Sequence, residues 1–421
     1  MSGPENWNWE TGEKTIADLN QWRSTYQWVE EPYISPDGET VAAVVNIDEG
    51  VFNVCVNGDC WEADEGFEKV WYPRFSPDGR LTAIVCADMV WTLALDGTPW
   101  GDTYDYLWNT MFSADGKTIA AAVQSEGMYG MVVNGACWEK MYPNMNGMIL
   151  SADGTHTAAC VQVEDCGETD LDKFQSGIFS AAVNGVTWDR QFVNVWNMAF
   201  SPDCSRLAAE VRVNLYDYTL AVDGNPWNKT FNCVWGPVFH PAKGTVLAPV
   251  KTGGAWGLAE DGELIWDAKY VQLWHQMVSP ASGSIAAIVA PKFGKWTVAV
   301  DEKPWPVSFD DLVTDTVFSS DGRHVAALGM TAGKYAVLVD GTPWPETFEM
   351  AWQPVFSPDG QTVAARVEKD GVYTLAVNGK VWRHRCEFVG EPVFSPDGTM
   401  LLCKSIEDGV CYRRVVALSD F

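Results

Sequence analysis

The sequence predicts an all-β protein in which about ten four-stranded sheets follow one another around a ring that the N-terminal strand closes. Three observations lead to this prediction. One turn phrase returns ten times at a nearly constant spacing. Short apolar segments and hairpin signals lie between successive turns, and no long stretch shows the 3.6-residue periodicity of a helix. A period of this length is typical of a repeat architecture.

The repeat is marked by the turn phrase Ser-Pro-Asp-Gly or a close variant. Pro fixes φ, Asp can bond its own downstream backbone and Gly accepts a positive φ, so the phrase suits a tight turn. Eight of the nine intervals between copies are 37 to 41 residues long, and the remaining one is 50 residues long. The ten copies start at Ser35, Ser76, Ser113, Ser151, Ser201, His240, Ser279, Ser319, Ser357 and Ser395.

Each unit is predicted to contain four short strands. The first ends in the turn phrase, as in EPVFSPDG at 391–398. The second is a short apolar run, such as VAAVV at 41–45, which suits a strand covered on both faces. The third ends in Asn-Gly or Asp-Gly, as in VYTLAVNG at 372–379, and this dipeptide is the strongest short hairpin signal. The fourth starts at the tryptophan that follows the hairpin.

Four strands in about 40 residues, repeated around a ring, describe the blade of a β-propeller. The phrases FSPDG, VAAV and YTLAVDG resemble the WD40-like propeller repeat of the TolB type, and the resemblance covers residues 22 to about 418. The WD dipeptide and GH pair of true WD40 proteins do not recur here. Since propellers typically have four to eight blades, ten blades are unusual.

The two ends of the chain predict how the ring closes. The segment that starts at Trp22 aligns without a gap on the segment that starts at Trp227, so the pattern begins with a fourth-type strand. The last unit supplies only three strands, and the N-terminus most simply provides its missing outer strand. We expect an N-terminal extension over 1–21 and one propeller over 22–421 with an insertion at 163–177. Two smaller propellers are the alternative.

Tryptophan occurs 22 times, and ten copies close the repeated phrase. An aromatic residue follows four positions later in eight units, and a second tryptophan follows eight positions later in five. Even offsets place side chains on one face of a strand, so we expect a column of rings that the next blade covers. An electron route or sugar-stacking platforms are the functional alternatives. The positions predicted to pack the blades are Trp22, Trp61, Trp100, Trp138, Trp188, Trp227, Trp266, Trp305, Trp344 and Trp382.

The charge limits the classes of partner. A formal net charge of −28 disfavours binding to nucleic acid or anionic lipid and favours a basic partner surface. The eleven cysteines are scattered, which is typical of reduced thiols. The N-terminal residues lack a secretory signal pattern, and no run approaches the roughly 18 to 20 apolar residues of a membrane span. We therefore expect a cytoplasmic location.

Motifs of the common catalytic and cofactor sites do not occur in the sequence. It has no G-x-S-x-G elbow, no phosphate-binding G-x-x-x-x-G-K-[ST] loop and no C-x-x-C pair. Cys55 and Cys60 lie five residues apart across a turn, but this is not the spacing of a zinc or iron–sulfur site. We expect no catalytic residues, no metal ligands, no cofactor and no enzymatic activity.

The insertion at 163–177 is where the repeat is most strongly broken. It extends the loop between the second and third strands of the fourth unit, and it carries five acidic residues against Lys173. We predict a docking element for a basic partner surface, with a solvated acidic flap as the alternative. The candidate partner-binding residues are Glu164, Asp165, Glu168, Asp170 and Asp172.

An acidic, tryptophan-dense propeller without cofactor motifs resembles one further family, the tryptophan-rich subunit of the transmembrane redox complex of sulfate-reducing bacteria. The tryptophan-ended phrases and the second tryptophan series carry this resemblance. It implies a non-catalytic scaffold of an electron-transfer complex, cytoplasmic and held at the membrane through partner subunits. The implied partners are an iron–sulfur subunit of the heterodisulfide-reductase type, a membrane cytochrome b and, across the membrane, a multihaem cytochrome c.

A propeller enzyme or small-ligand binder of the glycosidase or lyase type is the alternative function. Such a protein would use the central channel, which strand-one residues such as Glu31, Arg74 and Asn197 could line. A periplasmic interaction module of the TolB type is disfavoured by the free thiols and the missing signal.

Overall fold

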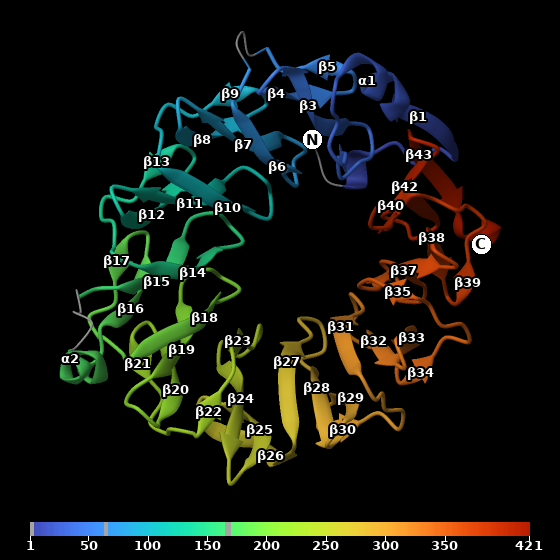
Figure 1. Cartoon of the computed structure of the whole chain (residues 1–421). Coiled ribbons are helices and arrows are strands. Elements are labelled where there is room, and N and C mark those ends of the chain that lie inside the picture. The colour runs from blue at the N-terminus through green and yellow to red at the C-terminus, as the bar shows by residue number, and fades with distance from the viewer. Residues whose placement is uncertain (1–3, 63–65, 165–169) are drawn as a thin grey trace. The chain divides into compact units, whose positions relative to one another are not determined.

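The strands of the protein form antiparallel sheets that follow the predicted repeat (Figure 1). The computed structural model describes residues 4–62, 66–164 and 170–421. The predicted fold class, an all-β propeller with ten four-stranded blades, is confirmed. The chain divides into two compact units: Met1–Leu107 together with Phe309–Phe421, here called the first unit, and Trp108–Ser308, the second unit. The first unit contains both ends of the chain, whereas two smaller consecutive propellers would require two consecutive units.

Five blades belong to the first unit. They are β2 (Tyr33–Ile34), β3 (Val41–Asp48), β4 (Val51–Val56) and β5 (Asp59–Cys60); β6 (Lys69–Phe75), β7 (Leu81–Ala87), β8 (Val90–Leu95) and β9 (Thr98–Pro99); β31 (Leu312–Phe318), β32 (Val325–Thr331), β33 (Lys334–Val339) and β34 (Thr342–Pro343); β35 (Met350–Ala351), β36 (Val355–Phe356), β37 (Val363–Lys369), β38 (Val372–Val377) and β39 (Lys380–Val381); and β40 (Phe388–Val389), β41 (Val393–Phe394), β42 (Met400–Glu407) and β43 (Val410–Ala417) with β1 (Gly12–Asp18). In three of these blades the strands pair in chain order; in the β35 sheet β35 and β36 both pair with β37, and in the last blade β40 and β41 both pair with β42 while β1 pairs with β43.

The other five blades belong to the second unit, apart from the first residues of β10. They are β10 (Tyr106–Phe112), β11 (Ile119–Ser125), β12 (Met128–Val133) and β13 (Ala136–Cys137); β14 (Met145–Leu150), β15 (Thr157–Gln162), β16 (Phe179–Val183) and β17 (Val186–Thr187); β18 (Asn194–Phe200), β19 (Leu207–Arg212), β20 (Tyr218–Val222) and β21 (Asn225–Pro226); β22 (Cys233–Val234), β23 (Val238–Phe239), β24 (Val246–Thr252), β25 (Ala255–Glu260) and β26 (Glu263–Tyr270); and β27 (Gln272–Val278), β28 (Ile285–Lys292), β29 (Lys295–Val300) and β30 (Lys303–Pro304).

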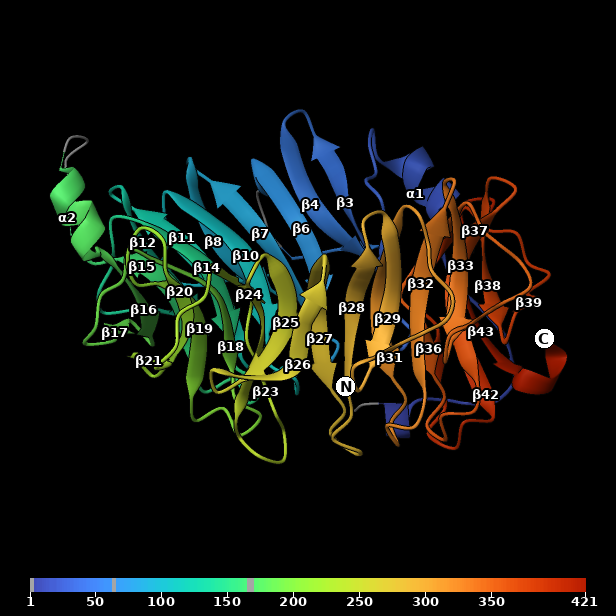
Figure 2. The ribbon, with the colours of Figure 1, turned by 90° about the horizontal axis from the view of Figure 1, so that it is seen from below.

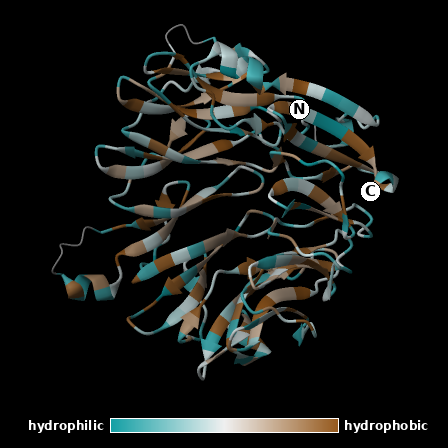
Figure 3. Ribbon diagram, turned by 45° about the vertical axis from the view of Figure 1, so that its right-hand side comes forward, coloured by the Kyte–Doolittle hydropathy of each residue, from teal (hydrophilic) through white to brown (hydrophobic). Residues whose placement is uncertain are grey.

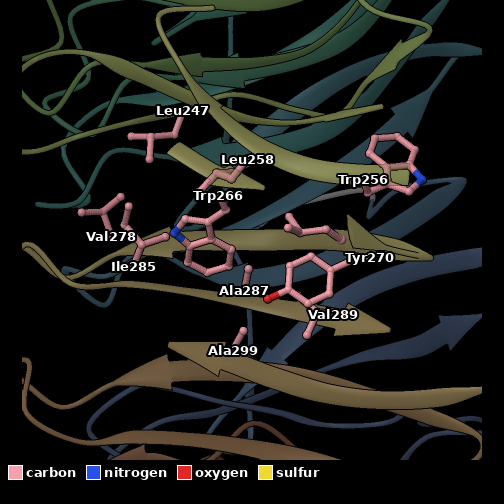
Figure 4. Close-up of a cluster of buried hydrophobic side chains, with 11 residues drawn as sticks. Leu247, Trp256, Leu258, Trp266, Tyr270, Val278, Ile285, Ala287, Val289 and Ala299 are labelled. Carbon is pink, nitrogen blue, oxygen red and sulfur yellow. The ribbon is translucent and has the colours of Figure 1, made fainter. Parts of the chain in front are cut away.

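The core lies in the second and third strands, whose apolar runs are buried. Every residue of 41–45 in β3 is at most 1% exposed, and hydrophobic residues run along the strands of both units (Figure 3). Large rings fill the space between neighbouring blades of the second unit, where Trp266 and Tyr270 of β26 pack with Ile285 and Val289 of β28 (Figure 4). Each such ring removes roughly 150–250 Å² from water, so the blades are held together mainly by apolar contact.

The first strand of most blades is interrupted. In β18 and β27 the pairing register shifts next to Asn197 and His275, which have φ of +40° and +49°. In the sheets of β22 and β35 the strand is split in two around Pro237 and Pro354. Because proline has no N–H to donate and a bulge leaves a residue unpaired, both devices re-aim side chains on this edge strand.

The predicted closure by an N-terminal strand is confirmed, but the closing strand is not the one that the sequence indicated. β1 supplies it from residues 12–18, where Gly12 pairs with Val415 of β43. The segment at Trp22 forms the helix α1 (Leu19–Thr25) instead of a strand. Asp18 starts this helix, since its side chain accepts a hydrogen bond from the Asn20 N–H, which is N-cap chemistry. The predicted extension over 1–21 therefore contributes a strand of the last blade.

Helical segments are few and short. Besides α1, the described residues contain the helix α2 (Leu171–Ser176) and two 3₁₀ segments, η1 (Pro4–Asn6) and η2 (Leu418–Asp420). None of these helices has the length and apolar character needed to cross a membrane.

Candidate functional site

The two kinds of hairpin turn are built in the same way in most blades. In the Ser-Pro-Asp-Gly turn, Ser357 Oγ donates to Asp359 Oδ1 at 2.6 Å and accepts from the Thr362 N–H at 2.9 Å. In the turn between strands three and four, Asn378 has a φ of +46° and its Oδ1 accepts from the Val363 N–H at 2.9 Å. The serine–aspartate bond recurs in eight blades. A carboxylate used for turn geometry in so many units is not a catalytic group.

Several of the phrase-ending tryptophans lie against a hairpin glycine of the following blade. All ten are buried or half-buried. In the second unit a Cβ on Gly185 would come within 3.2 Å of Trp138, and one on Gly224 equally close to Trp188. Both glycines also have a φ near +80°. The glycine of the phrase therefore meets two requirements. It adopts the left-handed conformation of the turn, and it has no side chain at the place where a tryptophan of the preceding blade approaches.

The second tryptophan series does not continue the column of the first. The fourth strand is mostly two residues long, and even the eight-residue β26 ends at Tyr270. The tryptophan eight positions on therefore lies in strand one of the next blade, as Trp274 does in β27. There it meets an aromatic residue of strand three: ring centroids lie 4.6 Å apart for Trp274 and Trp296, and 5.5 Å apart for Trp235 and Trp256. The expected single column on one strand is wrong because the strand ends too early.

The three residues that the sequence suggested for the channel separate into two groups. Glu31 and Arg74 line one cavity of about 540 Å³ in the first unit, together with Glu391 and Lys404. Asn197 belongs to the second unit, where its Nδ2 donates to Glu210 Oε2 at 2.8 Å. Each group thus contains a charged residue from strand two, a strand that the sequence pattern assigns to apolar packing.

These strand-two charges were missed by sequence reasoning, although a signal exists. Glu210, Arg366 and Lys404 each stand nine residues after the first residue of their turn phrase. The same position carries apolar residues such as Val44 in β3 and Leu328 in β32. Glu210 is 5% exposed and Lys404 is 8% exposed. A charged residue inside an otherwise apolar strand is not explained by core packing. Buried charges are rare unless another group compensates them.

Arg366 is the most unusual of the three. Its guanidinium lies over the Trp352 ring, 4.1 Å from the ring centroid. Nη1 donates to the Val389 carbonyl at 3.2 Å, whereas the buried Nε has no hydrogen-bond partner among the described residues. Burial lowers the pKa of Arg366, and the nearby carboxylate of Glu391 counteracts this effect. A guanidinium that is desolvated and only partly bonded still has capacity to bind an acceptor.

A cavity of about 400 Å³ opens beside Arg366 in the first unit. Besides Arg366, its wall combines aromatic surface, one further arginine, two glutamates and apolar residues, and Glu31 also lines the Lys404 cavity. A mainly apolar pocket with a few convergent polar groups is the usual form of a small-ligand site. The residues that line it are Leu19, Arg23, Glu31, Pro32, Trp352, Arg366, Tyr373, Glu387, Phe388, Val389 and Ile406.

Lys404 shows how the local backbone accommodates a buried cation. Its Nζ donates to the Pro36 carbonyl at 3.2 Å, and burial lowers the pKa of the ammonium group. A Cβ on Gly390 would lie 3.2 Å from Lys404 Cε, so this glycine makes room for the side chain. The lysine joins the last blade to the first turn of the chain.

Glu210 is the counterpart in the second unit. Burial raises the pKa of Glu210 to about 7, and the hydrogen bond from Asn197 acts in the opposite direction. Asn197 also lines a groove with Trp235, Trp274 and His275. The groove is shallow and its histidine side chain is exposed, so these residues do not form an acid–base pair held at a fixed distance.

Residues 171–176 of the acidic insertion form the helix α2, which stands off β16 and β17 of its unit (Figure 2). Asp170 caps the helix by accepting from the Lys173 N–H at 3.0 Å, and Lys173 Nζ lies 3.4 Å from Glu164 Oε2. Asp172 is exposed. Asp165 and Glu168 lie outside the described residues. Three of the five predicted partner-binding residues thus lie on or beside one short helix.

Comparisons with known proteins do not extend this picture to a family. No family model matches the chain, and no curated protein matches its sequence. Among solved structures, a chain described as the eukaryotic initiation factor is 13% identical over 78% of this chain and 90% of its own, with a TM-score of 0.48. A chain from a study of two prolyl endopeptidases is 12% identical over 72% of this chain and 55% of its own, with a TM-score of 0.37.

The class of protein is therefore defined by its own strands. It is a β-propeller of ten blades whose turns and tryptophans serve packing. Its candidate sites are the Arg366 cavity in the first unit and the acidic helix α2 in the second.

Proposed function

We propose that this propeller is a non-catalytic interaction subunit that docks a basic partner surface through α2. One observation carries the proposal: α2 buries none of its residues, yet it is capped by Asp170 at its start and ends at Gly177, which has a φ of +100°. The cap and the turn give the segment a defined shape without contributing to the core. Leu171 at its first turn is 68% exposed, so the helix presents an apolar residue beside acidic ones.

The chemistry of α2 fits a basic protein surface with an apolar contact at its centre. Asp172 and Glu164 provide negative charge at the rim, and the net charge of −28 adds a long-range attraction to a cationic partner. Rim charges mainly set association rate and specificity, whereas a desolvated apolar residue contributes more to affinity. We expect Leu171 to be the residue whose truncation weakens binding most.

We further propose that the partner belongs to a membrane-associated electron-transfer complex. The support is the resemblance of the tryptophan-rich, WD40-like repeats to the tryptophan-rich subunit of the transmembrane redox complex. In this proposal the chain is a cytoplasmic scaffold that contacts the iron–sulfur subunit of the heterodisulfide-reductase type. Through that subunit it is held at the membrane cytochrome b, with the multihaem cytochrome c on the far side.

Affinity purification of the tagged chain from its native source, followed by absorbance spectroscopy, tests both proposals. We expect haem and iron–sulfur bands in the purified complex. The variant Glu164→Lys/Asp172→Lys should lose the partner, whereas the matched control Asp48→Lys/Glu49→Lys, at the exposed end of β3 and in the turn that follows it, should retain it. Equal retention by both variants contradicts docking through α2. Capture of a partner without haem or iron–sulfur contradicts the redox complex alone.

A second candidate function is the binding of a small anionic ligand, and the cavity beside Arg366 favours it. The free Nε and the Trp352 ring would receive a carboxylate on a flat group. Screening carboxylic acids by calorimetry against the native chain and Arg366→Met distinguishes this function from docking, since α2 is untouched. Binding that survives in Arg366→Met excludes this cavity as the site.

A further inference from the structure

Two cysteines face each other across a hairpin of the first blade. Cys55 of β4 pairs directly with Cys60 of β5, on either side of the Asn57-Gly58 turn. The neighbouring pair is joined by the hydrogen bond from the Trp61 N–H to the Val54 carbonyl at 3.0 Å. Since hydrogen-bonded and non-bonded pairs alternate, Cys55 and Cys60 form a non-bonded pair with Cα atoms about 4.5 Å apart. That separation is within the range that a disulfide spans.

The surroundings of the two thiols differ. Cys60 is half-buried, and its Sγ lies 3.2 Å from the hydroxyl of Tyr26, just after α1. Cys55 is buried and its thiol is hydrogen-bonded to Cys60. This bond from Cys55, and then the bond from Tyr26, lower the pKa of Cys60 to about 6 against the effect of burial. The hydrogen bond to Cys60 is the main cause of the raised pKa of Cys55 and of the raised pKa of Tyr26.

A second blade provides the matching arrangement without the second thiol. Cys137 of β13 also directly precedes a phrase-ending tryptophan and is also half-buried. The residue opposite it is Val132 of β12, in the register that Cys55 occupies opposite Cys60. The comparison isolates what is special about the first blade, namely a second sulfur within bonding reach.

We propose that Cys55 and Cys60 are a peroxide-sensitive dithiol that closes to a disulfide. The Cys60 thiolate attacks one oxygen of hydrogen peroxide, the O–O bond breaks, and hydroxide leaves to give a sulfenic acid on Cys60. The Cys55 thiol then attacks the Cys60 sulfur, an S–S bond forms and water leaves. Both sulfurs are oxidised, and both peroxide oxygens are reduced to the level of water.

The charges around the hairpin favour a small neutral oxidant. Asp59 adjoins Cys60 and raises the pKa of the thiol by repulsion, and Glu62 follows two residues later. An anionic disulfide such as oxidised glutathione is repelled by the same field, whereas hydrogen peroxide carries no charge. Tyr26 is a positioning residue, because its hydroxyl stabilises the thiolate without taking part in bond formation.

Oxidation of the fully reduced native chain with hydrogen peroxide near neutral pH tests the proposal. We expect a loss of about two mass units and a disulfide-linked peptide joining Cys55 to Cys60. In Cys55→Ser the reaction should stop at a sulfenic acid on Cys60 that a cyclic diketone probe traps. Cys137 is the internal control and should react more slowly in the same sample.

Tyr26→Phe separates a tuned thiolate from a merely accessible thiol. It should slow the oxidation of Cys60 several-fold at pH 7 and shift the pH midpoint of the rate upward, with the disulfide still forming. An unchanged pH profile contradicts the role of Tyr26. Oxidation of Cys60 and Cys137 at equal rates, without a Cys55–Cys60 linkage, overturns the dithiol.

Discussion

The blades of β18–β21 and β35–β39 carry opposite charges at the same position of strand two. Glu210 in the second unit bonds to Asn197, and its raised pKa means that a proton neutralises it over part of the neutral range. Arg366 in the first unit cannot lose its charge in this way, so its guanidinium stacks on Trp352 and lies beside a cavity. The same position of strand two thus accommodates an ionisable residue in two ways. The acid, Glu210, can be neutralised by a proton, and the base, Arg366, stacks on an aromatic ring.

The largest loss of stability is expected where a charge is placed at this position without a proton to neutralise it or an aromatic ring to stack on. Leu328 of β32 is fully buried and lies opposite Thr314 instead of a tryptophan. Leu328→Arg should cost about 4 kcal/mol or more, because an uncompensated charge would be buried. Urea unfolding measures the loss, and Leu328→Met, which conserves volume, should cost less than about 1.5 kcal/mol. A small loss for Leu328→Arg would mean that this strand tolerates charge everywhere.

Glu210 should make the stability of the protein depend on pH. The pKa of Glu210 is raised by burial to about 7, so the folded state binds the proton more tightly than the unfolded state. The stability contribution of this residue is therefore highest below the unfolded pKa and decreases as the pH rises from about 4.5 to about 7, by roughly 3 kcal/mol.

The control for this pH dependence is Glu210→Gln, which has no proton to lose. The difference in unfolding free energy between the two proteins, measured by urea titration across that interval, should change in favour of the variant as pH rises. Parallel curves would show that Glu210 ionises normally in the folded state.

The base should prove inessential to stability. Arg366→Met keeps much of the side-chain volume over Trp352 and removes a desolvated charge, so the free energy of unfolding should change by less than about 1 kcal/mol or should increase. The midpoint of chemical unfolding measures this. A loss above about 2 kcal/mol would make Arg366 a structural residue and would remove the reason to connect it with a ligand.

The smallest effect concerns the contact between Arg366 and Trp352 itself. A double-mutant cycle with Arg366→Met and Trp352→Leu should give a coupling of about 0.5–1 kcal/mol, the usual strength of a partly exposed cation–π pair. The cycle with Val44→Ala in place of Arg366→Met should show no coupling, because Val44 packs in a separate core cluster with Val54 and Phe67. A coupling near zero in the first cycle would mean that the ring only shields the cavity.

Most of the fold could be predicted from the repeat, whereas the places where the structure departs from the repeat could not. Turn residues such as Asp359 and hairpin glycines such as Gly185 favour one local backbone conformation, so the blades could be counted from the sequence. The closing strand over 12–18 carries no repeat phrase. Only its pairing with β43 identifies it as a strand of the last blade. Spacing alone likewise could not show that Trp274 begins a new blade.

The candidate sites were harder to predict for a related reason. The acidic residues of the insertion stood out because the insertion breaks the period. Arg366 and Lys404 break the apolar pattern without changing the period, and only a position-by-position comparison of the second strands shows them. Their neighbours Trp352 and Gly390 come from other segments, so the contacts that make them notable depend on tertiary structure.

The pairing of β1 with β43 also has a consequence for synthesis of the chain. Gly12 meets Val415, so roughly 400 residues separate two neighbours in one sheet. A ribosome makes β1 roughly 400 residues before β43, and until then β1 has no β43 to pair with. Contacts of such high sequence separation form slowly, and an unpaired edge can recruit other chains. During translation, nascent chains therefore need protection at the edge of β1 while the ribosome makes the residues between β1 and β43.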